Sequence, residues 1–121
     1  MKLALAQLNT TVGDIAGNEA KILAAYRRGA AAGADLVAVP ELAIAGYPPR
    51  DLLLKNGFVA RNLEALERLA AATGRTALVV GYVGRNDVRP GRETTNANET
   101  IKSNKAGKIV GSAAARLFAR M

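Results

Sequence analysis

An apolar segment that stops at a proline, just before a carboxylate, is the feature that most constrains the fold of this chain. Val37, Ala38 and Val39 have strand character, and Pro40 and Glu41 follow them directly. Because proline cannot donate a ladder hydrogen bond, the strand is expected to end there. The carboxylate of Glu41 is then expected at the end of a buried strand, which is a usual place for an acid or a base.

Strand-like and helix-like segments alternate along the chain up to about residue 83. The expected strands are residues 3–8, 35–39 and 76–83, and the expected helices are residues 19–32 and 57–73. Both faces of the first strand are apolar, which is typical of a strand inside a sheet. Each helix is followed by a glycine that stops it, Gly33 or Gly74. This alternation predicts an α/β sheet with helices packed on it.

Several local features refine this prediction. Glu64 and Arg68 are four residues apart and are expected to pair on the exposed side of the second helix. Pro48 and Pro49 predict a rigid loop after Glu41. Asp51, which follows this loop, is more typical of a helix N-cap for the next three residues than of a catalyst.

The chain becomes more polar after Gly84. Residues 85–95 predict a loop, and residues 96–104 and 109–111 predict two strands joined by a turn. Residues 113–121 have the pattern of a short helical or frayed tail. No internal repeat or low-complexity linker interrupts the sequence.

Composition excludes several kinds of chemistry. A chain of 121 residues forms one domain at most, and it contains neither cysteine nor histidine. Disulfides, zinc thiolate sites and a cysteine nucleophile are therefore excluded from this chain, and no metal site is expected. Carboxylate, lysine, tyrosine and hydroxyl groups remain. No run approaches the length of a membrane span or a signal peptide, so the prediction is a cytoplasmic protein without membrane contact.

The net charge of +7 is unevenly distributed. Residues 1–84 hold nine Lys and Arg against seven Asp and Glu, whereas residues 85–121 hold eight against three. Phe118 is the only aromatic residue in that basic last third. Because nucleic-acid surfaces usually interleave basic and stacking side chains, no nucleic-acid partner is expected.

Five ordered blocks of this sequence have the spacing of a known superfamily. The longest covers residues 33–54 and includes Pro40-Glu41 and Gly46-Tyr47-Pro48-Pro49. The other blocks are residues 4–9, residues 12–18, residues 77–81, and Asn96-Ala97 with Gly107-Lys108-Ile109-Val110. Together they resemble the nitrilase, or carbon–nitrogen hydrolase, superfamily. Within it, the Gly-Tyr-Pro-Pro-x-Asp-Leu-Leu segment is similar to the glutaminase domain of glutamine-dependent NAD synthetases.

The resemblance implies a fold and an activity. It implies that residues 1–111 are the N-terminal part of a carbon–nitrogen hydrolase domain, forming the first half of an α-β-β-α sandwich. It also implies that Glu41 is the general base of glutamine hydrolysis, with ammonia passed on for NAD formation. Tyr47 would line the substrate mouth, although a tyrosine beside two prolines is more often loop packing. ATP and Mg are implied only for a synthetase domain outside this chain.

The sequence also departs from the superfamily pattern. The mechanism uses Glu, Lys and Cys together, but the region of the lysine is Ser112-Ala113-Ala114-Ala115-Arg116 here, and cysteine is absent. Residues 112–121 are therefore read as a divergent tail, for which a frameshift or truncation is one hypothesis. The fragment is expected to be inactive alone. Two alternatives stay open: a fragment of a free-standing amidase of this superfamily, or a non-catalytic module that associates through an exposed sheet face.

Overall fold

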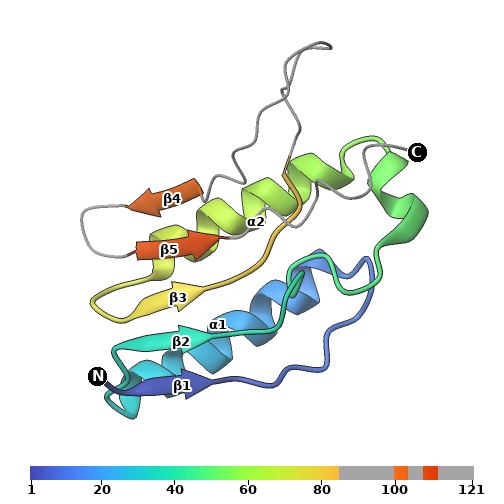
Figure 1. Ribbon diagram of the computed structural model, residues 1–121. Coiled ribbons are helices and arrows are strands. Elements are labelled where there is room, and N and C mark those ends of the chain that lie inside the picture. The colour runs from blue at the N-terminus through green and yellow to red at the C-terminus, as the bar shows by residue number, and fades with distance from the viewer. Residues whose placement is uncertain (85–99, 104–107, 112–121) are drawn as a thin grey trace, which may run out of the picture.

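The computed structural model describes residues 1–84 with their side chains, together with the backbone of residues 100–103 and 108–111. Strands and helices alternate through the first part (Figure 1). The elements are β1 (Leu3–Leu5), α1 (Ile15–Ala31), β2 (Leu36–Ala38), the 3₁₀ helix η1 (Arg50–Leu54), α2 (Phe58–Ala72), β3 (Ala77–Val79), β4 (Thr100–Ser103) and β5 (Lys108–Gly111). The predicted α/β class is confirmed.

The strands form one sheet in the order β1-β2-β3-β5-β4. β1, β2, β3 and β5 are parallel, and β4 pairs antiparallel with β5. The hairpin predicted from residues 96–104 and 109–111 is confirmed for the described strands. Parallel neighbours also place the carboxyl ends of β1, β2, β3 and β5 at the same edge of the sheet.

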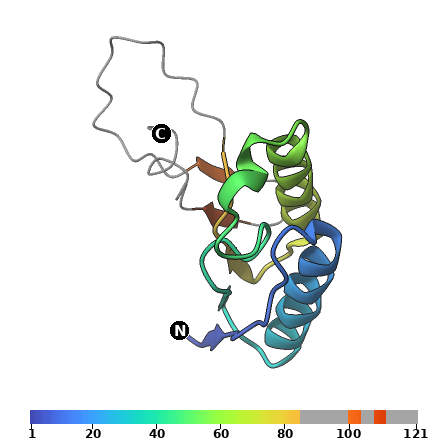
Figure 2. The same ribbon diagram turned by 90° about the vertical axis from the view of Figure 1, so that its right-hand side faces the viewer.

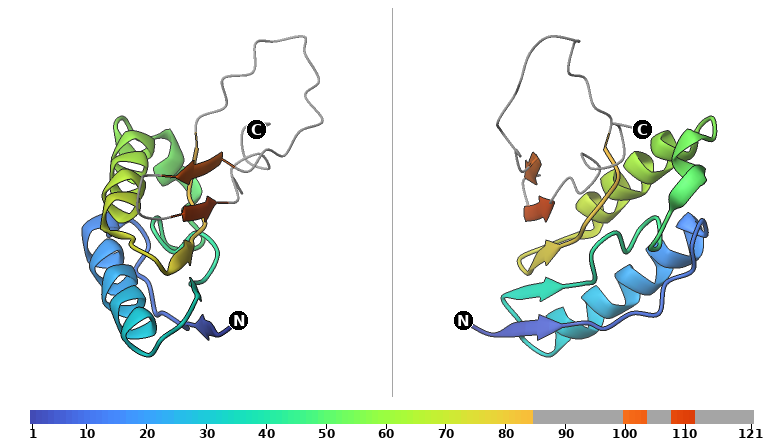
Figure 3. Two further views of the ribbon diagram at one scale, coloured as in Figure 1. Left: turned by 90° about the vertical axis from the view of Figure 1, so that its left-hand side faces the viewer. Right: turned by 45° about the vertical axis from the view of Figure 1, so that its right-hand side comes forward.

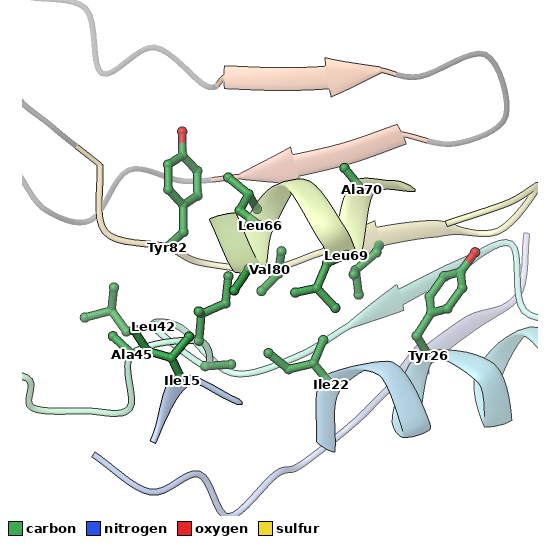
Figure 4. Close-up of a cluster of buried hydrophobic side chains, with 14 of the residues drawn as sticks. Ile15, Ile22, Tyr26, Leu42, Ala45, Leu66, Leu69, Ala70, Val80 and Tyr82 are labelled. Atoms are coloured by element: carbon green, nitrogen blue, oxygen red, sulfur yellow. The ribbon is translucent and has the colours of Figure 1, made fainter. Parts of the chain in front are cut away.

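Both helices cover the same face of the sheet, as the side views show (Figures 2 and 3). The buried core lies between these two layers and contains Ile22 and Tyr26 of α1 and Leu66 and Leu69 of α2 (Figure 4). Val37 and Leu78, the central residues of β2 and β3, are almost completely buried. Each helix therefore turns an apolar stripe toward the sheet.

The opposite face of the sheet has no helix on it among the described residues. Ala4, Val37 and Leu78 occupy one register row, and the first two lie against Gly29 of α1. Because strand side chains alternate between faces, their neighbours in the strands point away from the helices. These neighbours, named here the open face, are Leu3, Leu5, Leu36, Ala38, Ala77 and Val79. The open face is entirely apolar.

The expectation that residues 3–8 form an interior strand is wrong for the described sheet. β1 covers only three residues and lies at the edge, with Leu3 53% exposed and Leu5 82% exposed. Its apolar character on both faces arises because one face packs on α1 and the other belongs to the open face. The strand predicted at 76–83 is also shorter, since the ladder of β3 ends at Val79.

Helix α1 begins earlier than the spacing of apolar residues predicts. Asp14 is its N-cap, and the Asp14 Oδ1 atom accepts a hydrogen bond of 3.0 Å from the backbone N–H of Gly17. Residues 15–18, which lie before the predicted start at residue 19, therefore already form the first turn of α1. The predicted boundaries of α2 agree with the structure to within one residue, and α1 ends just before Gly33 as expected.

Two local predictions are wrong. Asp51 lies inside η1, whose N-cap is Pro49, and no side chain caps this helix. Arg68 forms its ion pair with Glu19 of α1 instead of with Glu64, through N–O distances of 2.9 and 2.8 Å. This bidentate hydrogen bond to Glu19 raises the pKa of the Arg68 guanidinium above its ordinary value. Sequence spacing favours the local pair, but helix packing brings a second carboxylate within reach.

Some predictions fall outside the described residues. These are the loop at 85–95, residues 105–107 of the turn predicted at 105–108, and the tail at 113–121. Within the described part, neither helix has the length and apolar character needed to cross a lipid bilayer.

Candidate active site

Glu41 lies where the sequence predicts it, at the carboxyl end of β2. The backbone N–H of Val39 still donates to the carbonyl of Val79 in β3, and Pro40 then ends the pairing. Residues 41–45 form a turn that is closed by a hydrogen bond of 2.8 Å from the N–H of Gly46 to the carbonyl of Leu42. This segment, residues 40–46, is named the Glu41 turn below.

The residue after Glu41 has an unusual backbone conformation. Leu42 has φ +52° although it is not glycine, and it is 5% exposed. A branched side chain in the left-handed region costs about 1–3 kcal/mol and persists only where the surroundings enforce it. Such strained positions are concentrated at functional sites. At Leu42 the chain turns sharply away from the direction of β2, immediately after the residue that carries the carboxylate.

A buried asparagine ties the Glu41 turn to the loop that follows β1. Asn18 of α1 is completely buried, and its Nδ2 atom donates to the carbonyls of Thr11 at 2.8 Å and Ile44 at 3.0 Å. Its Oδ1 atom accepts from the N–H of Thr11 at 2.8 Å. One side chain therefore holds two loops that are far apart in the sequence.

The same two loops also contact each other directly. The N–H of Gly13 donates to the carbonyl of Ala45 at 2.9 Å. Gly46 has φ +77°, and a Cβ atom added there would lie 2.6 Å from the Cα atom of Val12. Only glycine therefore fits this crossing point.

The segment that follows β3 packs against the other side of the Glu41 turn. A Cβ atom on Gly81 would lie 2.7 Å from the backbone N of Leu42 and 3.3 Å from the Cα atom of Glu41. Two residues later, the carbonyl of Val83 accepts a hydrogen bond of 2.6 Å from Nδ2 of the buried Asn62 in α2. The Glu41 turn is thus enclosed between the loops after β1 and β3.

The carboxylate-bearing residue itself is exposed, and so is the second predicted site residue. Glu41 is exposed in the described structure, although the strand that it follows is buried at Val37. Tyr47, which follows the turn, is 67% exposed. The structure thus brings both residues to the carboxyl edge of the sheet, with the turn backbone buried beneath them. An exposed carboxylate on a rigid backbone can accept a proton from a bound substrate or nucleophile.

The described residues contain no complete catalytic set. They include no group of three His, Cys, Asp or Glu side chains that could hold a metal ion. β5 ends at Gly111 at the same edge as Glu41. The superfamily lysine would follow this strand, but residues 112–116 lie outside the described residues.

Sequence reasoning did not identify Asn18, Asn62 or Gly81 as supports of this site. One signal was available for the two asparagines. Asn18 occurs four residues before Ile22 on the apolar stripe of α1, and Asn62 four residues before Leu66 on that of α2. A polar amide within an apolar stripe indicates a buried hydrogen-bonding role. No local pattern identifies Gly81, because its contact is with a distant segment.

Comparison with known proteins assigns the class. The sequence profile named Carbon-nitrogen hydrolase matches residues 2–114, so the chain belongs to the carbon–nitrogen hydrolase family. The resemblance stated from the sequence is confirmed.

Individual relatives share one name. The chain is 46% identical over 83 residues to a protein of Xylella fastidiosa strain Temecula1 named glutamine-dependent NAD(+) synthetase, covering 68% of this chain and 15% of the relative. It is 50% identical over 82 residues to the Synechocystis protein of that name, covering 67% and 15%. Against the Thermotoga maritima protein of that name it is 34% identical over 113 residues, covering 92% and 18%. The chain thus spans less than a fifth of the length of these relatives.

Proposed function

We propose that this chain forms the first part of a glutaminase domain in which Glu41 is the general base. Glutamine would be the substrate, and the ammonia released would serve a synthetase domain that makes NAD. The observation that carries the proposal is the Glu41 turn, a strained and clamped turn that holds a carboxylate at the carboxyl edge of the sheet. The relatives are named glutamine-dependent NAD(+) synthetases, and these names support the choice of glutamine as the substrate.

The residue types present in the chain limit which steps of glutamine hydrolysis it can carry out. In the proposed reaction Glu41 takes a proton from a thiol nucleophile and gives it to the departing ammonia as the thioester forms. It then takes a proton from the water that hydrolyses the thioester and returns that proton to the thiolate as glutamate is released. Cysteine is absent from the whole sequence. We therefore expect no glutaminase activity from these residues alone, because removing a nucleophile from a cooperative set costs about 10⁴–10⁶ in rate. Steady release of glutamate from glutamine by this chain, abolished by Glu41→Gln, would contradict this expectation.

A chimera provides the positive test. Residues 1–111 of this chain replace the matching N-terminal segment of the Thermotoga maritima relative, which aligns with 92% of the chain. The Glu41→Gln variant of an active chimera should lose about 10²–10⁴ of its glutamine-dependent rate. Glu64→Gln is the matched control, since Glu64 is an exposed carboxylate on α2. Equal activities of the two variants would refute the role of Glu41.

Tyr47 is proposed to line the entrance for the substrate. It is exposed, and it directly follows the Glu41 turn. In the same chimera, Tyr47→Ala should raise KM for glutamine with a smaller effect on kcat, because a binding contact acts on the ground state as well as on the transition state. A change in kcat alone would exclude this role.

The open face is proposed as the inner surface of one half of an α-β-β-α sandwich. Six apolar side chains on one sheet face are unfavourable in water, and a second sheet packed on them would remove them from it. In this chain by itself, we expect a second copy to cover the open face. Analytical ultracentrifugation should detect a dimer that Leu5→Lys weakens. The control is Leu54→Lys, because Leu54 is 86% exposed but lies on η1. A monomer at all concentrations would contradict the proposal.

The remaining assignments follow from the same proposal. ATP and Mg would bind the synthetase domain, and this chain would need no cofactor. The ligase activity would also belong to that domain, and the cytoplasm would be the site of action. Fractionation of cells that express the chain with an epitope tag tests the location.

A further inference from the structure

The backbone around Glu41 is held from two opposite sides by residues that do not themselves carry reactive groups. On one side, Asn18 bonds to the carbonyl of Ile44 inside the turn and to both backbone groups of Thr11. On the other side, Gly81 lies so close that an added Cβ atom would be 2.7 Å from the N atom of Leu42. Neither residue is predicted to touch the substrate.

We propose that Asn18 and Gly81 are positioning residues that fix the direction of the Glu41 carboxylate. The inference rests on the proposed function for its catalytic meaning, but its structural content is independent of that function. Leu42 has φ +52°, a conformation that relaxes unless neighbouring groups enforce it. Asn18 supplies the attractive part of this constraint through three hydrogen bonds, of which the one to Ile44 is buried and the two with Thr11 are partly buried. Gly81, which has no side chain, lets the segment after β3 pack directly against the Glu41–Leu42 peptide.

The burial of Asn18 argues for a specific role. An asparagine side chain that is completely buried costs free energy unless its hydrogen bonds are made. Here both the amide nitrogen and the amide oxygen have backbone partners at 2.8–3.0 Å. A helix position that only needed packing would be filled by an apolar residue. The side chain instead joins two loops whose ends meet at the carboxyl edge of the sheet.

Hydrogen exchange in the 121-residue chain tests the proposal directly. The N–H groups of Ala43 and Gly46 are bonded within the Glu41 turn, to the carbonyls of Pro40 and Leu42. In Gly81→Ala the new methyl group displaces the Glu41–Leu42 peptide, so these two amides should exchange at least about tenfold faster. The amides of Tyr26 in α1 and Leu66 in α2 serve as references and should keep their wild-type rates.

The matched control is Gly74→Ala. No heavy atom lies within 4 Å of a Cβ atom added at Gly74, so this variant makes the same chemical change without the contact. It should leave the exchange of Ala43 and Gly46 unchanged. Asn18→Leu, which keeps the volume but removes the hydrogen bonds, should accelerate the same two amides; if that variant does not fold, Gly81→Ala still decides the question. Uniform acceleration of all amides, or no acceleration in Gly81→Ala, would overturn the proposal.

Kinetics of the chimera then separate positioning from the function of Glu41 itself. Gly81→Ala should lower kcat about tenfold or more while KM for glutamine changes less than twofold, since displacing a base affects the transition state selectively. If Glu41→Gln leaves the chimera active, the proposed function fails, whereas the exchange result for Gly81→Ala still stands. If Glu41→Gln is inactive but Gly81→Ala is fully active, the proposed function stands and the positioning role is refuted.

Discussion

Replacing Tyr26 with phenylalanine removes one oxygen atom from the core and tests how helix α1 is attached to the start of β3. The hydroxyl of Tyr26 donates to the carbonyl of Thr76 at 2.8 Å and accepts from the N–H of Gly74 at 2.8 Å. Tyr26 is 5% exposed and projects from α1 within the core (Figure 4). Tyr26→Phe preserves the packing of the ring but leaves both backbone groups without this partner.

The size of the effect follows from the burial of the two partners. A buried polar group left without a hydrogen bond costs about 1–3 kcal/mol. The contact with Thr76 is buried, and the contact with Gly74 is only partly buried, so water can replace part of the second one. The free energy of unfolding should therefore fall by about 2–3 kcal/mol.

Urea denaturation followed by far-UV circular dichroism measures this change. With a slope of about 1–3 kcal/mol/M, the midpoint should fall by roughly 0.7–3 M while the slope stays constant. Tyr47→Phe is the matched control, because it removes the same hydroxyl oxygen from a side chain that is 67% exposed to water. It should change the free energy of unfolding by less than about 0.5 kcal/mol. Equal midpoints for the two variants would refute the reasoning.

Three further predictions test other parts of the structure. Phe58→Ala should lower the free energy of unfolding by about 3–5 kcal/mol, because Phe58 is 2% exposed at the start of α2, whereas Phe58→Leu should cost clearly less in the same urea assay. Gly46→Ala should cost at least about 1 kcal/mol, since φ is +77° and Val12 blocks the Cβ position, while Gly74→Ala should be neutral or slightly stabilising; equal stabilities would contradict the crossing of the two loops. Glu19→Gln should lower the thermal midpoint slightly at low salt and not at 1 M NaCl, because the Glu19–Arg68 pair lies at the surface. The raised pKa of Arg68 stabilises the fold at every pH below its unfolded value, so loss of this contribution is expected only in strongly alkaline solution, and a loss near neutral pH would contradict the assignment.

Much of the fold could be predicted because its elements are local. The apolar spacing of α2 and the short β runs specify an element from neighbouring residues alone. The antiparallel pairing of β4 with β5 was predictable for the same reason, since only four residues separate these strands in the sequence. The start of α1 was missed because the Asp14 cap lies in a segment whose glycine and asparagine are typical of loops.

The candidate site was predictable only in part. The place of Glu41 at the end of β2 followed from Pro40, which ends the strand. Its exposure did not, because burial depends on what packs over the turn and not on the residues beside it. The same limit applies to Arg68, whose partner lies 49 positions away in the sequence.

The sequence by itself determined the order of strands and helices, the residue that ends β2 and the family to which the chain belongs. These properties depend on residue type, on periodicity and on the spacing of short motifs. Only the tertiary structure decided that β1 is an edge strand, that the described residues leave one face of the sheet uncovered, and that Asn18 and Gly81 enclose the Glu41 turn. The physical reason is that a periodic pattern records which side of an element avoids water. It does not record which distant segment covers that side, and such contacts are formed only when the chain packs.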